Sequence, residues 1–169
     1  TLFLRDLETT FAARVTKFLR EEMKCRALTT NMNNWHYPAV YQLPRAKSYD
    51  YVDDHFYVDH PRFLEQRWAL PSRCPNRNPM LGADMGAQGL TIRRVLDRPF
   101  TITEYNYSGP GRFRGVGGIA CGTAAALQNW AGLWRFAWSH GQQGVAHPET
   151  KTLNSFDMSG DPLGLASER

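Results

Sequence analysis

Short β-type segments that alternate with helical segments constrain the fold of this chain more than any other feature of its sequence. The predicted strands cover residues 26–33, 49–57, 99–105 and 131–138, and the predicted helices cover residues 2–24, 86–96, 113–130 and a last segment beginning at Asp161-Pro162. Strands that alternate with helices are typical of parallel pairing, because a parallel connection must cross back over the sheet. We therefore predict one α/β domain, without internal repeats or a linker between two cores.

The first predicted helix is amphipathic. Apolar side chains recur every three or four residues, and charged residues occupy most positions between them. The apolar stripe consists of Leu4, Leu7, Phe11, Val15 and Phe18. A helix with this pattern is expected to pack its stripe against a core.

Two other segments have distinctive composition. Residues 61–89 are rich in Pro, Asn, Arg and Gly, which predicts a long irregular loop of the kind that often carries function. The helix predicted over residues 113–130 contains many Gly and Ala residues, including Gly115, Gly117 and Gly118. Its intrinsic helix propensity is low, so we expect close tertiary packing to hold it.

Each predicted strand ends in polar or aromatic groups that could bind a polar ligand. In parallel α/β folds the carboxyl ends of the strands meet at the ligand site. The four ends are Asn33-Asn34-Trp35, His55-Phe56-Tyr57, Glu104-Tyr105-Asn106 and Trp138-Ser139-His140. Four such ends together favour a binding site over coincidence.

Glu104 is the most informative single residue, because it follows an apolar β-branched run at the point where the strand reaches the surface. One interpretation is a strand-end ion pair; the other is a positioned nucleophile or acid/base group influenced by His55 and Tyr57. His55 and Tyr57 are two residues apart and would share one face of a strand. Trp138 is expected to be exposed for stacking on a sugar ring, whereas Trp130 and Trp134 are expected in the core.

Composition excludes several classes of protein. The net charge is only +4, from 20 Lys and Arg against 16 Asp and Glu, so a nucleic-acid-binding surface is not expected. Three cysteines without a Cys-x-x-Cys pair predict free thiols rather than a disulfide framework or a zinc site. No apolar run is long enough to span a membrane, and no P-loop, dinucleotide fingerprint or hydrolase elbow is present. We expect no metal and no organic cofactor. The sequence does not indicate a cellular compartment.

The strand ends resemble, in order, strands six, seven and eight of the clan A retaining glycoside hydrolases, which are (β/α)8 barrels. The motifs are His55-Phe56-Tyr57, Thr103-Glu104-Tyr105-Asn106 and Phe136-Ala137-Trp138. The resemblance implies that residues 26–33 form strand five and that the chain is a partial TIM barrel, namely its C-terminal half. It covers nearly the whole chain, and its specificity lies in the order of short motifs.

The resemblance also implies roles for individual residues. Glu104 corresponds to the catalytic nucleophile, and Tyr57 to the tyrosine that hydrogen-bonds it. The corresponding carbohydrate-binding residues are His55, Trp138, Asn33, Trp35 and Asn106.

The sequence departs from the family in one important respect. The family's acid/base is a Glu preceded by Asn at the end of strand four, and this chain contains no Asn-Glu pair. A complete barrel needs roughly 250 residues, whereas this chain has 169. We therefore expect a C-terminal fragment truncated at both ends, inactive in isolation, whose partner is the missing N-terminal half of the barrel.

Two other functions remain open from the sequence. The first is a non-catalytic carbohydrate-binding protein with an aromatic-lined cleft. The second is an arginine-rich nucleic-acid module, for which no recognised signature is present.

Overall fold

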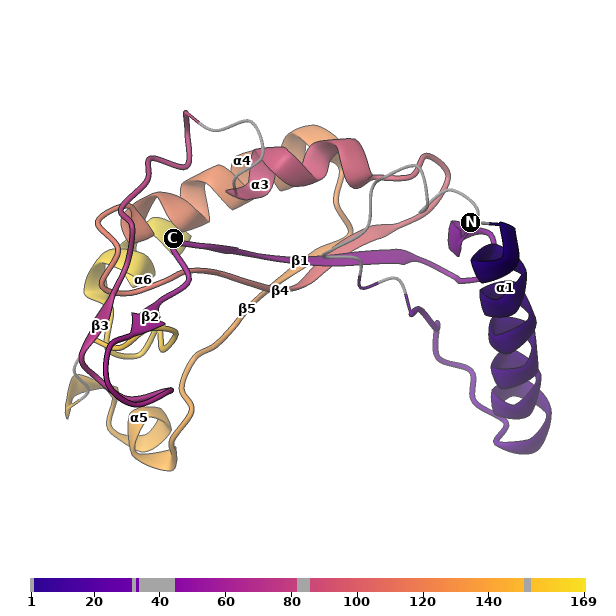
Figure 1. Ribbon diagram of the computed structural model, residues 1–169, viewed down its shortest axis with the longest axis horizontal. Helices are drawn as coiled ribbons and strands as arrows, with labels where there is room; N and C mark the ends of the chain where they lie inside the picture. Colours follow the sequence, from indigo (N-terminus) through magenta and orange to yellow (C-terminus); the bar gives the residue numbers. More distant parts are fainter. Residues whose placement is uncertain (1, 32, 34–44, 82–85, 151–152) are drawn as a thin grey trace.

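The computed structural model describes residues 2–31, 33, 45–81, 86–150 and 153–169 and contains a three-stranded parallel sheet. The strands are β1 (Val52–Val58), β4 (Phe100–Tyr107) and β5 (Gly132–Arg135), in the order β1-β4-β5. All three run in the same direction (Figure 1). The predicted α/β class is confirmed.

The register of β1 and β4 places the candidate residues side by side. His55 lies opposite Glu104 and Tyr57 opposite Asn106, after a shift in register between Asp54 and His55. Because the strands are parallel, their polar carboxyl-terminal halves lie at the same end of the sheet. The sheet therefore brings residues about 50 positions apart in the chain onto one surface.

Two helices, α3 (Gly86–Leu90) and α4 (Gly117–Gln128), pack over one face of the sheet (Figure 1). The core between these helices and the sheet holds aromatic side chains of β1 and β4. Phe56, for example, stacks on Tyr105 at 5.5 Å between ring centroids. Burial of the Cys121 thiol in this core raises its pKa to about 12. The predicted helix at 113–130 begins later, as α4 follows a turn of 3-10 helix at Arg114–Val116.

The glycines before and within α4 allow the close packing expected from the sequence. A Cβ on Gly117 would lie 2.8 Å from the Tyr107 ring, and one on Gly115 would lie 2.6 Å from Leu163. Leu163 belongs to α6 (Pro162–Glu168). This helix begins as predicted, because the Asp161 side chain accepts a hydrogen bond from the Gly164 amide at 3.1 Å.

The strand expected over residues 26–33 is wrong for its described residues, since 26–31 and 33 lie in no strand. The Asp50 carboxylate accepts hydrogen bonds from the amide and hydroxyl of Thr29, at 2.7 and 3.0 Å. Thr30 Oγ1 donates to the Tyr51 carbonyl oxygen at 2.7 Å. Side-chain hydrogen bonds of this kind offer the backbone an alternative to a ladder. Residues 32 and 34–44 lie outside the described part.

The fourth expected strand, residues 131–138, is shorter than predicted. β5 ends at Arg135, and the chain then bonds with the segment before α6: the Ala137 amide donates to the Phe156 carbonyl oxygen at 3.0 Å. The Ser159 amide donates likewise to the Trp138 carbonyl oxygen at 3.0 Å. Trp134 is 54% exposed, so its expected place in the core was wrong, whereas Trp130 is buried as expected.

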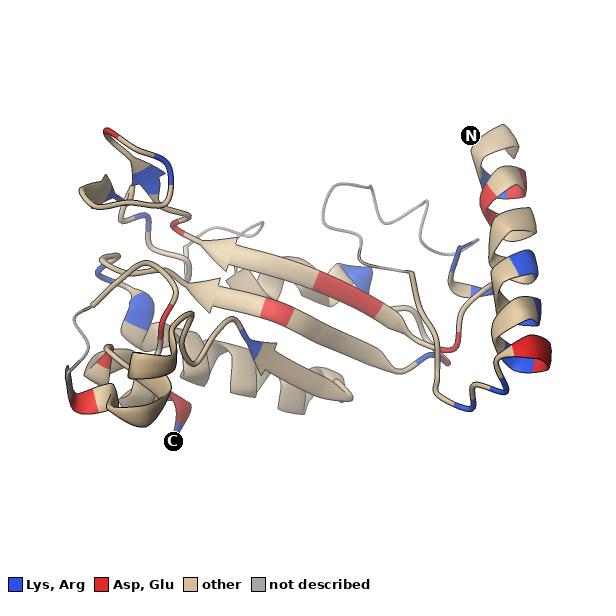
Figure 2. Ribbon diagram, turned by 90° about the horizontal axis from the view of Figure 1, so that it is seen from below, with Lys and Arg blue, Asp and Glu red and all other residues tan. Residues whose placement is uncertain are grey.

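Helix α1 (Leu2–Lys17) continues as one turn of π-helix over Phe18–Glu22, close to the predicted length. Its apolar stripe, however, does not pack on a core: Leu4 is 63% and Phe11 57% exposed. The helix stands apart from α3 and α4 at the far end of the sheet (Figures 1 and 2). Polar contacts attach it, including the Glu8–Arg45 ion pair at 2.6 Å.

The loop expected over residues 61–89 contains a small antiparallel ladder between β2 (Arg62–Phe63) and β3 (Ser72–Arg73). The predicted helix at 86–96 is present only as α3 and a 3-10 turn at Thr91–Arg93. After β5 come α5 (Gln142–Ala146) and a 3-10 turn at Pro148–Thr150. In the described ranges, no helix has the length and apolarity needed to cross a membrane.

Candidate active site

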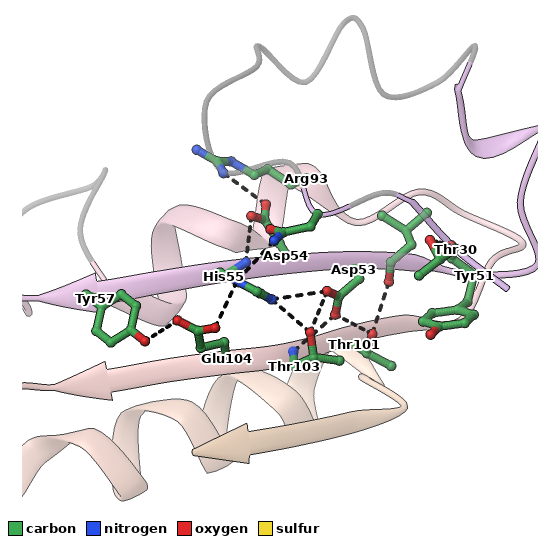
Figure 3. A network of polar contacts seen from close by, with 12 residues as sticks. Thr30, Tyr51, Asp53, Asp54, His55, Tyr57, Arg93, Thr101, Thr103 and Glu104 are labelled. Carbon is green, nitrogen blue, oxygen red and sulfur yellow. Dashed lines mark hydrogen bonds and ion pairs between the residues drawn. The ribbon is translucent and has the colours of Figure 1, made fainter. Parts of the chain in front are cut away.

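Glu104 and Tyr57 are in direct contact on neighbouring strands. The Tyr57 hydroxyl donates a hydrogen bond to Glu104 Oε1 (Figure 3). Burial, together with the adjacent Glu104 carboxylate, raises the pKa of the Tyr57 phenol well above its ordinary value. The phenol therefore keeps its proton over the working range of proteins and acts as a permanent donor to Glu104.

His55 lies between two carboxylates. Its Nδ1 is 3.6 Å from Glu104 Oε2, and its Nε2 is 3.4 Å from Asp53 Oδ2 (Figure 3). Asn33 contributes its side-chain nitrogen 3.2 Å from His55 Nδ1, and Thr103 Oγ1 lies 2.9 Å from Nε2. The imidazole therefore lies between the two acids, nearer to Asp53 than to Glu104, and the hydrogen-bond contacts with Asn33 and Thr103 set the orientation of its ring.

Asp53 anchors this arrangement from inside the sheet. It is 4% exposed and accepts three hydrogen bonds: from Thr101 Oγ1 at 2.7 Å, from the Thr103 amide at 3.1 Å and from Thr103 Oγ1 at 2.6 Å. Both threonines belong to β4, so Asp53 joins the two strands through its side chain as well as through the ladder. A buried carboxylate of this kind is stable only because each oxygen has donors.

The neighbouring Asp54 points away from this network, toward the helical side. Its carboxylate pairs with Arg93 at 2.9 Å and accepts a hydrogen bond from the His55 amide at 2.8 Å. Burial raises the pKa of Asp54 despite the Arg93 guanidinium. Because successive side chains of a strand point to opposite faces, Asp54 is separated from Asp53, His55 and the other residues near Glu104.

Glu104 and Tyr57 line a cavity of about 770 Å³ whose walls are largely aromatic. The lining residues are His55, Tyr57, His60, Phe63, Trp68, Leu70, Glu104, Phe136, His140, Asn154, Ser155 and Phe156. Phe156 is central to the wall, because its ring is 5.4 Å from Tyr57 and 6.2 Å from Trp68 between centroids. Apolar walls with a few convergent polar groups are typical of sites for small organic ligands.

Several lining residues were not foreseen from the sequence. Trp68 comes from the loop between β2 and β3, and Phe156 from the segment before α6. Neither segment has a periodicity that predicts which side chain points inward. The aromatic residues of loop 61–89 are the only signal in the sequence, and they do not show which of these side chains points inward.

The expected binding residues have different outcomes. His55 lines the cavity. Asn33 is not a lining residue, but its side chain contacts His55. Trp138 is 47% exposed as expected, but it is not among the residues that line the cavity. Trp35 lies outside the described residues.

Asn106 was expected to bind substrate, and the structure corrects this. Its side chain is 2% exposed; the amide nitrogen donates to the carbonyl oxygens of Phe136 and Phe156, and its Oδ1 accepts from Arg135 at 3.0 Å. Asn106 follows Glu104 by two residues, but it holds together the backbone of the cavity wall. It is not among the residues that line the cavity.

The chemistry available in the cavity is that of one positioned carboxylate. Glu104 is the only Asp or Glu among the described lining residues, and no cluster of three His, Cys, Asp or Glu able to hold a metal ion occurs in the described ranges. The three cysteines are free. A carboxylate that accepts a hydrogen bond from a phenol and lies beside an imidazole is suited to act as a nucleophile or a base.

Comparison with protein-family models, with curated proteins and with solved structures gave no match for this chain.

Proposed function

We propose that this chain carries the nucleophile of a retaining glycoside hydrolase, with Glu104 as that nucleophile. The observation that carries the proposal is the Tyr57–Glu104 hydrogen bond within an aromatic-lined cavity at the carboxyl-terminal half of parallel strands. In this proposal β1, β4 and β5 correspond to strands six, seven and eight of a (β/α)8 barrel, of which the chain forms a part.

The geometry supports the first half of a double displacement. A Glu104 oxygen would attack the anomeric carbon, the bond to the leaving oxygen would break with its electron pair, and a glycosyl ester would remain. The Tyr57 hydrogen bond holds one carboxylate oxygen and His55 lies 3.6 Å from the other, so rotation of the nucleophile is restricted before the reaction. The aromatic rings offer flat surfaces for the C–H faces of a sugar.

Both steps of the reaction need a second carboxyl group. Retaining enzymes place their two carboxyls about 5–5.5 Å apart; the second one protonates the leaving oxygen in the first step and activates water in the second. No other carboxylate lines the cavity in the described part of the chain. We therefore propose that the proton donor comes from outside this part, and that the chain alone hydrolyses ordinary glycosides very slowly.

A substrate that needs no proton donor tests the proposal directly. Aryl 2-deoxy-2-fluoroglycosides with a dinitrophenolate leaving group react at the nucleophile alone, and their 2-fluorine slows release of the ester. The chain is incubated with a panel of such glycosides of different sugars, and the adduct is located by peptide mass spectrometry. We expect one adduct, on Glu104.

Two variants control this experiment. Glu104→Gln is expected to give no adduct, and Glu149→Gln, at a side chain that is 68% exposed and outside the cavity, is expected to label like the parent chain. Lack of an adduct with every sugar, or an adduct on another residue, would refute the assignment of Glu104. Saccharide binding detected by tryptophan fluorescence without any adduct would instead support a non-catalytic carbohydrate-binding protein, for which the aromatic walls are also suited.

A further inference from the structure

We propose that His140 is a second recognition residue of the cavity, binding a ring hydroxyl of the ligand, and that Asp157 is its positioning residue. The proposal rests on the proposed function in one respect, namely that the cavity takes a saccharide. Neither residue belongs to the network around Glu104.

The His140–Asp157 pair has the geometry of an oriented imidazole. His140 Nδ1 lies 2.5 Å from Asp157 Oδ1, and the His140 amide donates to the same oxygen at 3.3 Å. The Asp157 side chain is 1% exposed, whereas that of His140 is 51% exposed. The carboxylate is therefore fixed in the interior, and the imidazole that it holds reaches into the cavity.

The loop that carries Asp157 is itself held in place. Asn154 Oδ1 accepts hydrogen bonds from the amides of Phe156 and Asp157, at 2.9 and 2.7 Å. Burial acts to raise the pKa of Asp157, but the hydrogen bonds from His140 and Asn154 outweigh it and hold this pKa below its ordinary value. Asp157 thus stays ionised and accepts a hydrogen bond from His140 Nδ1–H.

The tautomer follows from this contact. An imidazole that donates from Nδ1 to a carboxylate keeps Nε2 as its acceptor when neutral. Nε2 has no hydrogen-bond partner among the described residues. Because His140 lines the same cavity as Glu104, this acceptor is available to a ligand hydroxyl.

The surroundings of His140 favour a hydroxyl as its partner. Its ring meets Phe136 edge-on at 5.0 Å between centroids, and Phe136 in turn meets Tyr57 at 6.4 Å. The titratable groups facing it are Asp157 behind the ring and His55, Tyr57, His60 and Glu104 elsewhere on the cavity wall. With Asp157 behind the ring and Glu104 on the wall of the same cavity, an anionic ligand group is disfavoured, while a sugar can donate a hydroxyl to Nε2 and stack its ring on the aromatic wall.

The first measurement determines the tautomer of His140 and does not depend on catalysis. Long-range ¹H–¹⁵N correlation spectra of the whole chain at pH 8 are expected to show His140 protonated at Nδ1. In Asp157→Asn the preference for this tautomer is expected to weaken. Observation of the Nε2–H form of His140 in the parent chain would overturn the proposal.

The second measurement is ligand binding, using saccharides of the sugars that label Glu104 or, if none labels, the same panel of methyl glycosides. We expect the ligand to shift the ¹⁵N resonance of His140 Nε2. We also expect His140→Ala to weaken binding about three- to tenfold, as for loss of one hydrogen bond. His140 is half exposed, so this variant is expected to fold. The matched control is His147→Ala, because His147 also contacts a carboxylate, Glu149 at 3.3 Å, but lies outside the cavity.

The results separate this proposal from the previous one. Labelling of Glu104 with unchanged affinity in His140→Ala would overturn the role of His140 and leave the nucleophile assignment intact. A shift at His140 with weaker binding in His140→Ala, but no adduct on Glu104, would support His140 and refute the nucleophile. Absence of binding by every saccharide would overturn the recognition role together with the carbohydrate site.

Discussion

Replacement of Asp53 by Ala is the most stringent test of how the candidate site is built. Asp53 is almost fully buried and joins β1 to β4 through three hydrogen bonds, to Thr101 and Thr103. The substitution removes the acceptor of all three and the carboxylate that faces His55 Nε2. It therefore removes side-chain contacts that join the two strands and, at the same time, a contact of His55, which lies beside Glu104.

The expected loss of stability follows from these contacts. A hydrogen bond to a charged group contributes about 1.5–3 kcal/mol, so three bonds give an upper figure of about 5–9 kcal/mol. The two hydroxyls can turn toward other acceptors, and water can enter the space left by the carboxylate, which reduces the loss. We expect Asp53→Ala to lower the free energy of unfolding by about 3–5 kcal/mol. Asp53→Asn keeps the Oδ1 acceptor of two bonds and is expected to cost about 1–2 kcal/mol.

Urea unfolding followed by far-UV circular dichroism measures these differences. The matched control is Asp97→Asn, at an exposed position with φ of 65°, a conformation that Asn accepts readily; its effect is expected to stay within about 0.5 kcal/mol. A loss below about 1 kcal/mol in Asp53→Ala, or equal losses in the Ala and Asn variants, would show that the buried hydrogen bonds do not hold the two strands together.

Two further predictions concern the whole chain. The pKa of Asp157 is lowered in the folded state. Its contribution to stability is therefore complete above the unfolded pKa of about 3.9 and is lost as the pH falls through the folded pKa. Acid titration of Asp157→Asn should show a smaller drop in stability below about pH 4 than that of the parent chain. The exposed apolar stripe of α1 is expected to cause self-association at high concentration. Sedimentation of Phe11→Glu should show a lower mean mass with an unchanged melting temperature, and an unchanged mass would contradict this.

The alternation of helices and strands was sufficient to predict the α/β class and the three strands of the sheet. The positions of His55, Tyr57 and Glu104 could also be predicted, because each falls within a β-type run and the two-residue spacing fixes which side chains share a face. Parallel pairing brings them to the same end of the sheet, and the shift in register between Asp54 and His55, which the sequence does not indicate, places His55 opposite Glu104. Local pattern and long-range pairing agree here.

Other parts of the site could not be predicted, for physical reasons. Trp68 and Phe156 reach the cavity from segments without periodicity, so their direction depends on tertiary contacts. Asn106 has the spacing of a cavity residue, yet two backbone carbonyl groups capture its amide. The stripe of α1 predicted a buried face, but periodicity shows only that a face is apolar and not what it packs against.

The arrangement around Glu104 separates support from exposure. Asp53, whose carboxylate accepts three hydrogen bonds, is buried in the sheet, while Glu104 is about one-third exposed, accepts a hydrogen bond from the Tyr57 phenol and lies beside the His55 imidazole. A carboxylate with fewer donors is more reactive toward an electrophile, because less of its charge is already compensated. His55 lies between the two carboxylates, 3.4 Å from Asp53 and 3.6 Å from Glu104. This division is consistent with the proposed role of Glu104 as a nucleophile.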